Sequence, residues 1–184
     1  TPAKATEAVA LSAGTEESNN VPSAGNTNLP SAWVKTESVQ KETNGIWTDI
    51  GKDEQLDQNS TYHLNVTYEI PNTEKPKTDV TYEYSLPSVF EGITSSGDIF
   101  NSSNEKMGTY GVENGKILLN ISASSIANLS NLKGYFSCGF KFDKTQITTQ
   151  KTITVTFPVT SKIETFCFQE DTNSYLSTEK KQLE

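Results

Sequence analysis

Two stretches of strict alternation constrain this chain more than any other feature of its sequence. In residues 61–70 every second side chain is aliphatic or aromatic, and the side chains between them are polar or charged. Residues 79–86 repeat the pattern after a segment, PNTEKPKT, whose two prolines indicate a loop. A period of two places alternate side chains on opposite faces of a β-strand. The pattern therefore predicts two strands, each with one buried and one solvated face.

Further strand signals follow along the chain. Residues 107–121 are typical of a β-hairpin, because Asn114 and Gly115 suit the two positive-φ positions of a type I′ turn. Shorter or less regular strands are expected at 33–39, 46–50, 135–142, 152–159 and 162–168. Only residues 122–132 have apolar side chains at helical spacing. We therefore predict an all-β fold, an antiparallel immunoglobulin-like β-sandwich of about 7–9 strands with at most one short helix.

The sandwich does not account for the whole chain. Residues 1–31 are rich in Ala, Thr, Ser, Asn and Glu, and this composition buries too little apolar surface to offset the entropy lost on ordering. We predict a flexible leader over 1–31, the sandwich over 32–170, and a charged linker toward a further domain over 171–184. The low hydrophobic content of 33% is then an average over a leader without a core and a two-layered sandwich.

Charge argues against two classes of partner. All 15 basic residues are lysine, and the formal net charge is -8. Without arginine the chain lacks the planar donor that reads phosphate and guanine, so we predict no nucleic-acid binding. A negative chain is also repelled by anionic membrane surfaces. No apolar run approaches the roughly 18 residues of a membrane-spanning helix, so we expect no membrane insertion.

Catalytic and metal-binding patterns are weak. His63 is the single histidine and lies on the polar face of the strand over 61–70, which predicts a solvated side chain. Neither G-x-S-x-G nor H-E-x-x-H occurs, so a His63-dependent hydrolase is disfavoured. The acidic residues between 49 and 59 lack the spacing of an EF-hand loop and indicate a solvated loop. We therefore expect no enzyme activity, no metal and no cofactor.

The two cysteines leave two alternatives open. Cys138 shares the phase of Phe136 and Phe140 and should point into the core, whereas Cys167 is out of phase with its aromatic neighbours, so its side is ambiguous. A Cys138–Cys167 disulfide would close a loop of about 30 residues and stabilise the fold by roughly 3 kcal/mol. Two buried free thiols are the alternative. An extracellular location would favour the disulfide.

Several motifs occur in a fixed order between residues 33 and 160: LNVTYEIP from Leu64, YEYSLP from Tyr82, GTYGVENGKI from Gly108, then GYFSCGFKF and TITVTF. This series resembles the N-terminal immunoglobulin-like domains of Gram-positive cell-wall adhesins of the collagen-adhesin type. The resemblance implies a non-enzymatic binding module on the extracellular surface, anchored to the wall through a C-terminal region outside this chain. Its expected partners are a host matrix or plasma protein, or a surface glycan, together with adjacent domains of the same polypeptide.

The same resemblance implies a self-formed Lys–Asn isopeptide bond promoted by a buried acid. Lys35, on the first long strand, is the lysine that we would assign to such a bond, although no asparagine or acid partner can be matched to it.

Three functions remain open at this stage. The first is an adhesin domain that binds a macromolecule without covalent chemistry. The second is a lectin-like module in which Trp47 or Tyr110 stacks on sugar rings, although packing on its strand for Trp47 and a core position for Tyr110 explain these side chains better. The third is a structural spacer. A long open groove along one sheet would favour the protein adhesin, a compact pocket of aromatic and amide side chains the lectin, and neither feature the spacer.

Overall fold

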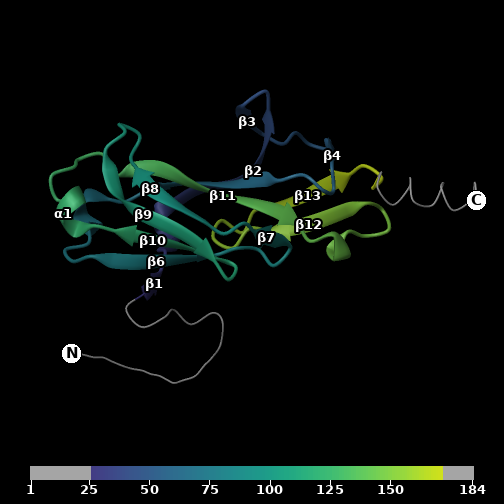
Figure 1. Cartoon of the computed structure of the whole chain (residues 1–184). Helices are drawn as coiled ribbons and strands as arrows, with labels where there is room; N and C mark the ends of the chain where they lie inside the picture. The colour runs from purple at the N-terminus through teal and green to yellow at the C-terminus, as the bar shows by residue number, and fades with distance from the viewer. Residues whose placement is uncertain (1–25, 172–184) are drawn as a thin grey trace, which may run out of the picture.

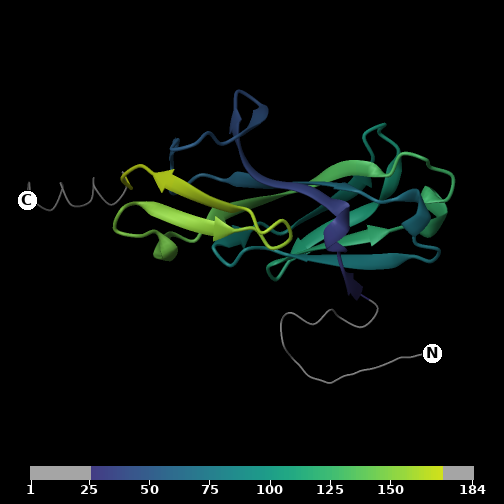
Figure 2. The ribbon, with the colours of Figure 1, turned by 180° about the vertical axis from the view of Figure 1, so that it is seen from behind.

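The structure, a computed structural model, describes residues 26–171. These residues form an all-β sandwich of two stacked five-stranded sheets, with a smaller third sheet at one end (Figures 1 and 2). In spatial order the first sheet consists of β1 (Asn26–Asn28), β6 (Val80–Ser85), β10 (Lys116–Ile121), β9 (Lys106–Glu113) and β8 (Ser95–Phe100). The second consists of β3 (Ile46–Asp49), β2 (Val34–Thr43), β5 (Tyr62–Glu69), β11 (Lys133–Phe142) and β7 (Phe90–Gly92). The third consists of β12 (Thr152–Thr156), β13 (Ile163–Phe168) and β4 (Gln55–Leu56).

The alternating segments form strands for the reason that their pattern suggested. In β5 the buried side chains are Tyr62, Leu64, Val66 and Tyr68, and the residues between them are partly exposed. The hairpin of β9 and β10 turns at Asn114 and Gly115, whose φ angles are 51° and 75°. The one α-helix of the described residues, α1 (Ala123–Ile126), lies in the segment with helical spacing, and the Ser122 side chain caps its first turn. The all-β sandwich is therefore confirmed, while the immunoglobulin-like assignment stays a prediction.

Two details of the predicted architecture are wrong. The described residues contain 13 strands rather than about 7–9, because β1, β4, β7 and β8 were not recognised. These strands are short or rich in Ser, Gly and Asn, and in β8 only Ile99 is buried, so they have no alternation to detect. The sheets are also not purely antiparallel, since β1 pairs in parallel with β6 and β4 in parallel with β13.

The predicted leader over 1–31 and linker over 171–184 lie outside the described residues, apart from residues 26–31 and Asp171. The leader boundary was placed too late. Residues 26–28 form β1, and the Asn26 side chain donates a hydrogen bond to the Glu83 carboxylate of β6. A strand held by polar contacts carries no hydrophobic signal, which explains why the sequence suggested a leader here.

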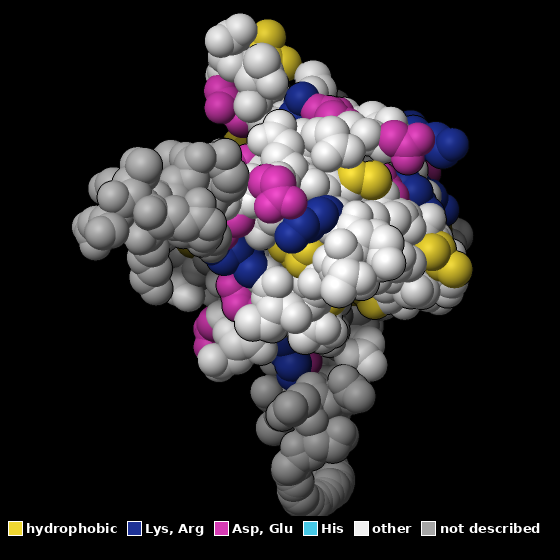
Figure 3. Space-filling view, turned by 90° about the vertical axis from the view of Figure 1, so that its right-hand side faces the viewer, with side chains coloured by type: hydrophobic (Ala, Val, Ile, Leu, Met, Phe, Trp, Pro, Cys, Tyr) yellow, Lys and Arg dark blue, Asp and Glu magenta, His cyan; other side chains and the backbone are white. Residues whose placement is uncertain are grey.

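A single hydrophobic core runs through the sandwich and into the third sheet. Phe142, at the end of β11, joins the two parts: its ring centroid lies 5.2 Å from that of Phe166 and 5.0 Å from that of Phe168, both on β13. It also lies 5.4 Å from Phe90 of β7. The third sheet is therefore packed onto the sandwich by aromatic contacts. Figure 3 views this end of the molecule, where the visible hydrophobic side chains lie scattered among polar and charged ones.

Candidate ligand-binding site

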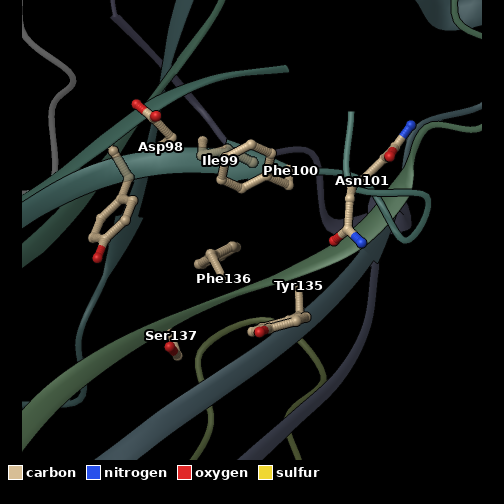
Figure 4. Close-up of a pocket in the computed structure, with 9 residues that line it drawn as sticks. Asp98, Ile99, Phe100, Asn101, Tyr135, Phe136 and Ser137 are labelled. Atoms are coloured by element: carbon tan, nitrogen blue, oxygen red, sulfur yellow. The ribbon is translucent and has the colours of Figure 1, made fainter. Parts of the chain in front are cut away.

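A pocket opens at the seam between the two large sheets, where the edge strand β8 faces β11 (Figure 4). Its volume is about 250 Å³. We call it the seam pocket. It is lined by residues of β8, β9, β11 and the loop after β8, namely Asp98, Ile99, Phe100, Asn101, Asn104, Tyr110, Tyr135, Phe136 and Ser137. Segments far apart in the chain therefore build one site.

The seam is open because β11 lacks a neighbouring strand along part of one edge. β7 pairs only with residues 140–142. Beside that pairing, the Ile93 N–H donates to the Gly139 carbonyl at 2.8 Å, and at the other end of β11 the Ser102 N–H donates to the Lys133 carbonyl at 2.9 Å. Alternate residues of an antiparallel strand direct their backbone groups to the same edge. Tyr135 and Ser137 therefore direct their N–H and C=O groups toward this edge. An isolated antiparallel bridge between Asn101 and Gly134 joins the start of β11 to the chain after β8, and in the described residues no strand ladder with β8 continues from there.

Aromatic side chains form much of the pocket wall. The Tyr110 ring lies against Gly97 of β8, and a Cβ at Gly97 would come within 2.8 Å of that ring, so only glycine permits this placement. The register of β8 and β9 shifts between Ile99 and Phe100. A bulge of this kind redirects a side chain, and the Phe100 side chain is 46% exposed. Tyr135 is 62% exposed on the opposite side of the seam, and the buried Ile99 and Phe136 line the pocket below.

The polar residues of the pocket divide into two kinds. Asn101 is buried, and its amide is fully used: its Oδ1 accepts from the backbone N–H groups of Ser103 and Glu105, and its Nδ2 donates to the Asn131 carbonyl at 2.8 Å. Asn101 therefore shapes one end of the pocket and is not free to bind a ligand.

Other polar groups of the pocket remain available. The Asp98 carboxylate is exposed and lies 3.3 Å from the Lys106 ammonium. The hydroxyls of Tyr110, Tyr135 and Ser137 form no hydrogen bond with another side chain or backbone group in residues 26–171. In Figure 4 the labelled residues of β8 lie across the opening from those of β11. The seam pocket thus combines aromatic surface with three hydroxyls that have no protein partner among the described residues and a carboxylate that has one, Lys106.

The two candidates for sugar stacking are separated in the structure. Tyr110 lies in the seam pocket, as described above. Trp47 does not: it lies on β3, where its ring stacks on that of His63 with 3.5 Å between centroids and 9° between planes. Trp47 is 36% exposed, so one side of the ring is packed against the protein.

His63 is not the solvated side chain that the alternation predicted. The indole of Trp47 covers it, and burial lowers the pKa of its imidazole. The stack joins β3 to β5 across β2, which lies between them in the second sheet, and alternation within β5 does not reveal this contact.

Both cysteines are free thiols in the structure, so the free-thiol alternative describes it better than the disulfide. Cys138 faces the core from β11, and burial raises the pKa of its thiol to about 11. Cys167 lies on β13 in the third sheet, opposite in phase to the buried Phe166 and Phe168, and is partly exposed. The expectation that both thiols are buried is therefore wrong for Cys167. The two residues belong to different sheets, and Cys138 faces the core whereas Cys167 does not.

Lys35 does not have the surroundings of an isopeptide donor. A register shift between Val34 and Thr36 turns its side chain outward, where its Nζ donates to the Ala32 carbonyl at 3.1 Å. The described residues bring a lysine, a buried acid and an asparagine together elsewhere. Lys116 Nζ lies 3.0 Å from Glu83 Oε1, and the Asn26 amide donates to Glu83 Oε2 at 2.8 Å. Neither Lys116 nor Asn26 was recognised from the sequence.

Sequence reasoning also missed Asp98, Phe100 and Tyr135. Phe100 lies in a Ser- and Gly-rich segment that had no recognisable period. Tyr135 did carry a signal, because it is the aromatic residue of β11 that is out of phase with Phe136 and Phe140. An aromatic side chain on the solvated face of a strand is a reason to suspect a binding surface.

Other features of the described residues bear on the type of site. Residues 26–171 contain no group of three or more His, Cys, Asp or Glu side chains arranged to hold a metal ion. Within the same residues no helix is long and apolar enough to cross a membrane. A scan against protein-family models and a search of curated proteins both found no match to this chain.

Proposed function

We propose that this chain is an extracellular adhesion module of a bacterial surface protein, which binds a macromolecular ligand non-covalently and without catalysis. The observation that carries the proposal is the seam pocket. There, the exposed rings of Phe100 and Tyr135 lie next to hydroxyl and carboxylate groups that have few or no partners in the protein. Aromatic side chains are enriched where proteins bind partners, because they offer much contact area at little conformational cost.

The composition of the pocket supports binding rather than reaction. Its lining residues supply hydroxyl, amide and carboxylate groups together with aromatic and aliphatic surface. A nucleophilic site requires a hydroxyl or thiol activated by an adjacent base, and the lining includes no histidine, cysteine or lysine. The ordered motifs that resemble cell-wall adhesins support the same proposal from the sequence side. A spacer would not need such a pocket.

A binding screen tests the proposal. The wild-type protein is presented to immobilised collagens, fibrinogen and fibronectin and to a glycan array. The double variant Phe100→Ala/Tyr135→Ala is tested in parallel, with Ile163→Ala as the control, because Ile163 is 68% exposed but lies on β13 in the third sheet.

We expect at least one ligand to bind the wild type and the control equally and the double variant about tenfold more weakly. A protein that binds nothing in the screen, or a double variant that binds as well as the wild type, would contradict the proposal.

A further inference from the structure

The seam pocket holds enough chemical detail to indicate the class of its ligand. The shape of the pocket first limits which ligands can bind. The open part of the β11 edge is short, because the bridge between Asn101 and Gly134 closes it on one side and the hydrogen bond at Gly139 closes it on the other. A strand usually pairs over about five or six residues, so an extended peptide cannot add to this edge in the usual way. A compact ligand fits the gap better.

The volume of the seam pocket also favours a compact ligand. Pockets for drug-sized ligands usually measure about 300–1,000 Å³, whereas the seam pocket measures about 250 Å³. It is therefore suited to a single ring with the rest of a larger ligand outside. The exposed edge of β8, beside Phe100, leaves room for such a ligand to continue into the solvent.

The walls of the pocket suit a ligand that is apolar on its faces and polar at its edge. Phe100, Tyr110 and Tyr135 supply flat apolar surfaces, and the two tyrosines carry hydroxyls at their outer ends. A pyranose ring has this character, because its C–H bonds form apolar faces while its hydroxyls lie around the rim. The Asp98 carboxylate and the Ser137 hydroxyl can accept hydrogen bonds from such hydroxyls.

The charge of the site excludes anionic ligands. Asp98 is the one side chain of the lining that is charged at neutral pH, and the formal net charge of the chain is -8. Both repel sulfates, phosphates and sugar carboxylates. Lys106 lies 3.3 Å from Asp98 and partly offsets its negative charge, but Lys106 is not among the residues that line the pocket.

We propose that the seam pocket binds one ring of a neutral saccharide, stacked against Tyr135 and Phe100 and hydrogen-bonded through two of its hydroxyls to the Asp98 carboxylate. The Ser137 hydroxyl supplies a further donor and acceptor at the ring edge. This inference rests on the proposed adhesion function and names its ligand class.

The test combines a glycan array with nuclear magnetic resonance. The array carries neutral and acidic glycans. The best neutral glycan is then titrated into isotope-labelled wild-type protein. We expect shifts of the backbone amide signals of Gly97, Tyr135 and Ser137, and little change at Ile163.

Two single variants and one control complete the design. Tyr135→Ala and Asp98→Asn should each weaken binding of the neutral glycan about tenfold, while Ile163→Ala binds as the wild type does. Tyr135 and Asp98 are exposed, so neither change should unfold the protein, and equal unfolding midpoints would confirm this.

Any result other than these expected ones contradicts the saccharide inference. The saccharide proposal fails if no neutral glycan binds, if only acidic glycans bind, or if the amide shifts fall outside the pocket. When glycans fail but a matrix protein binds and the double variant Phe100→Ala/Tyr135→Ala weakens it, the adhesion function stands and only the ligand class is wrong. When nothing binds, both proposals fall.

Discussion

At the scale of single residues, His63 and Trp47 show how one contact changes the chemistry of a side chain. The indole covers the imidazole, and burial lowers the pKa of His63 below its ordinary value. The folded protein therefore favours the neutral imidazole, whereas the unfolded chain protonates His63 more readily. Because the unfolded chain then binds more protons, stability is lost as the pH falls below the ordinary pKa of about 6.5.

We predict that the free energy of unfolding decreases between about pH 7 and about pH 5, before most carboxylates titrate. Urea denaturation at several pH values measures the decrease. His63 is the single histidine, so a His63→Gln variant should lose this part of the pH dependence. An identical decrease in that variant would show that another group is responsible.

The two thiols differ at the same scale. Cys138 is 1% exposed and has a pKa raised to about 11 by burial, so almost none of it is thiolate at neutral pH. Cys167 is partly exposed on the third sheet. We predict that iodoacetamide adds one label to the native protein, at Cys167, and two labels after denaturation. Mass spectrometry counts the labels, and peptide mapping locates them.

The intact mass of the unreduced protein provides the control. It should equal the mass of the sequence. A mass lower by two hydrogens, together with no labelling before reduction, would establish a Cys138–Cys167 disulfide instead. A mass lower by one ammonia would indicate an isopeptide bond, for which Lys116 and Asn26 are the residues to examine.

At the scale of elements, β2 contains a buried acid that joins three parts of the fold. The Glu37 carboxylate accepts a hydrogen bond from the Tyr84 hydroxyl of β6 and others from the backbone N–H groups of Val159 and Thr160 in the β12–β13 connection. The register shift before Thr36 places Glu37 on the core face, together with Val39. The acid thereby ties the second sheet to the first sheet and to the third.

Replacing Glu37 by alanine should destabilise the fold by about 2–4 kcal/mol, because the Tyr84 hydroxyl and the two backbone N–H groups lose their acceptor. Chemical denaturation measures the change. Ser38→Ala is the matched control: Ser38 is the next residue of β2 and points to the other face. A Glu37→Ala protein as stable as the control would show that this carboxylate is not a structural link.

The elements also show what a sequence pattern can and cannot predict. β5 and β10 were predictable because each buries one face and leaves the other at least partly exposed, so the alternation of side chains follows the core. β6 was predicted by the same alternation, although Glu83 on its polar face is also buried. β8 was not predictable, because an edge strand with a single buried side chain has no such period. The seam pocket was missed for the same reason, since β8 forms one of its walls.

At the scale of the whole molecule, Phe142 connects the sandwich to the third sheet. Its ring contacts Phe166 and Phe168 of β13 as well as Tyr62 and Phe90 in the second sheet. Because one core runs through all three sheets, the described residues should unfold in a single transition.

We predict that Phe142→Ala lowers the free energy of unfolding by about 3–5 kcal/mol, through lost burial and the cavity left behind. Calorimetry should still show one transition. Ile163→Ala, which removes an exposed side chain from the same third sheet, should change stability by less than about 0.5 kcal/mol. Two separate transitions in the wild type would show that the third sheet is an independent unit.

Local patterns in the sequence predicted the all-β class, the long strands, the Asn-Gly hairpin and the inward direction of Cys138. These properties depend on local backbone preference and on which face of a strand is buried. Both determine how apolar and polar side chains are spaced along the sequence. The packing of separate strands, in contrast, sets where the edges of the sheets lie, stacks Trp47 on His63, and brings Tyr110, Phe100 and Tyr135 into the lining of one pocket. Those contacts join residues from separate strands. They depend on the stacking of the sheets and on the bulges at Val34 and Ile99, for which alternation within a single strand carries no signal.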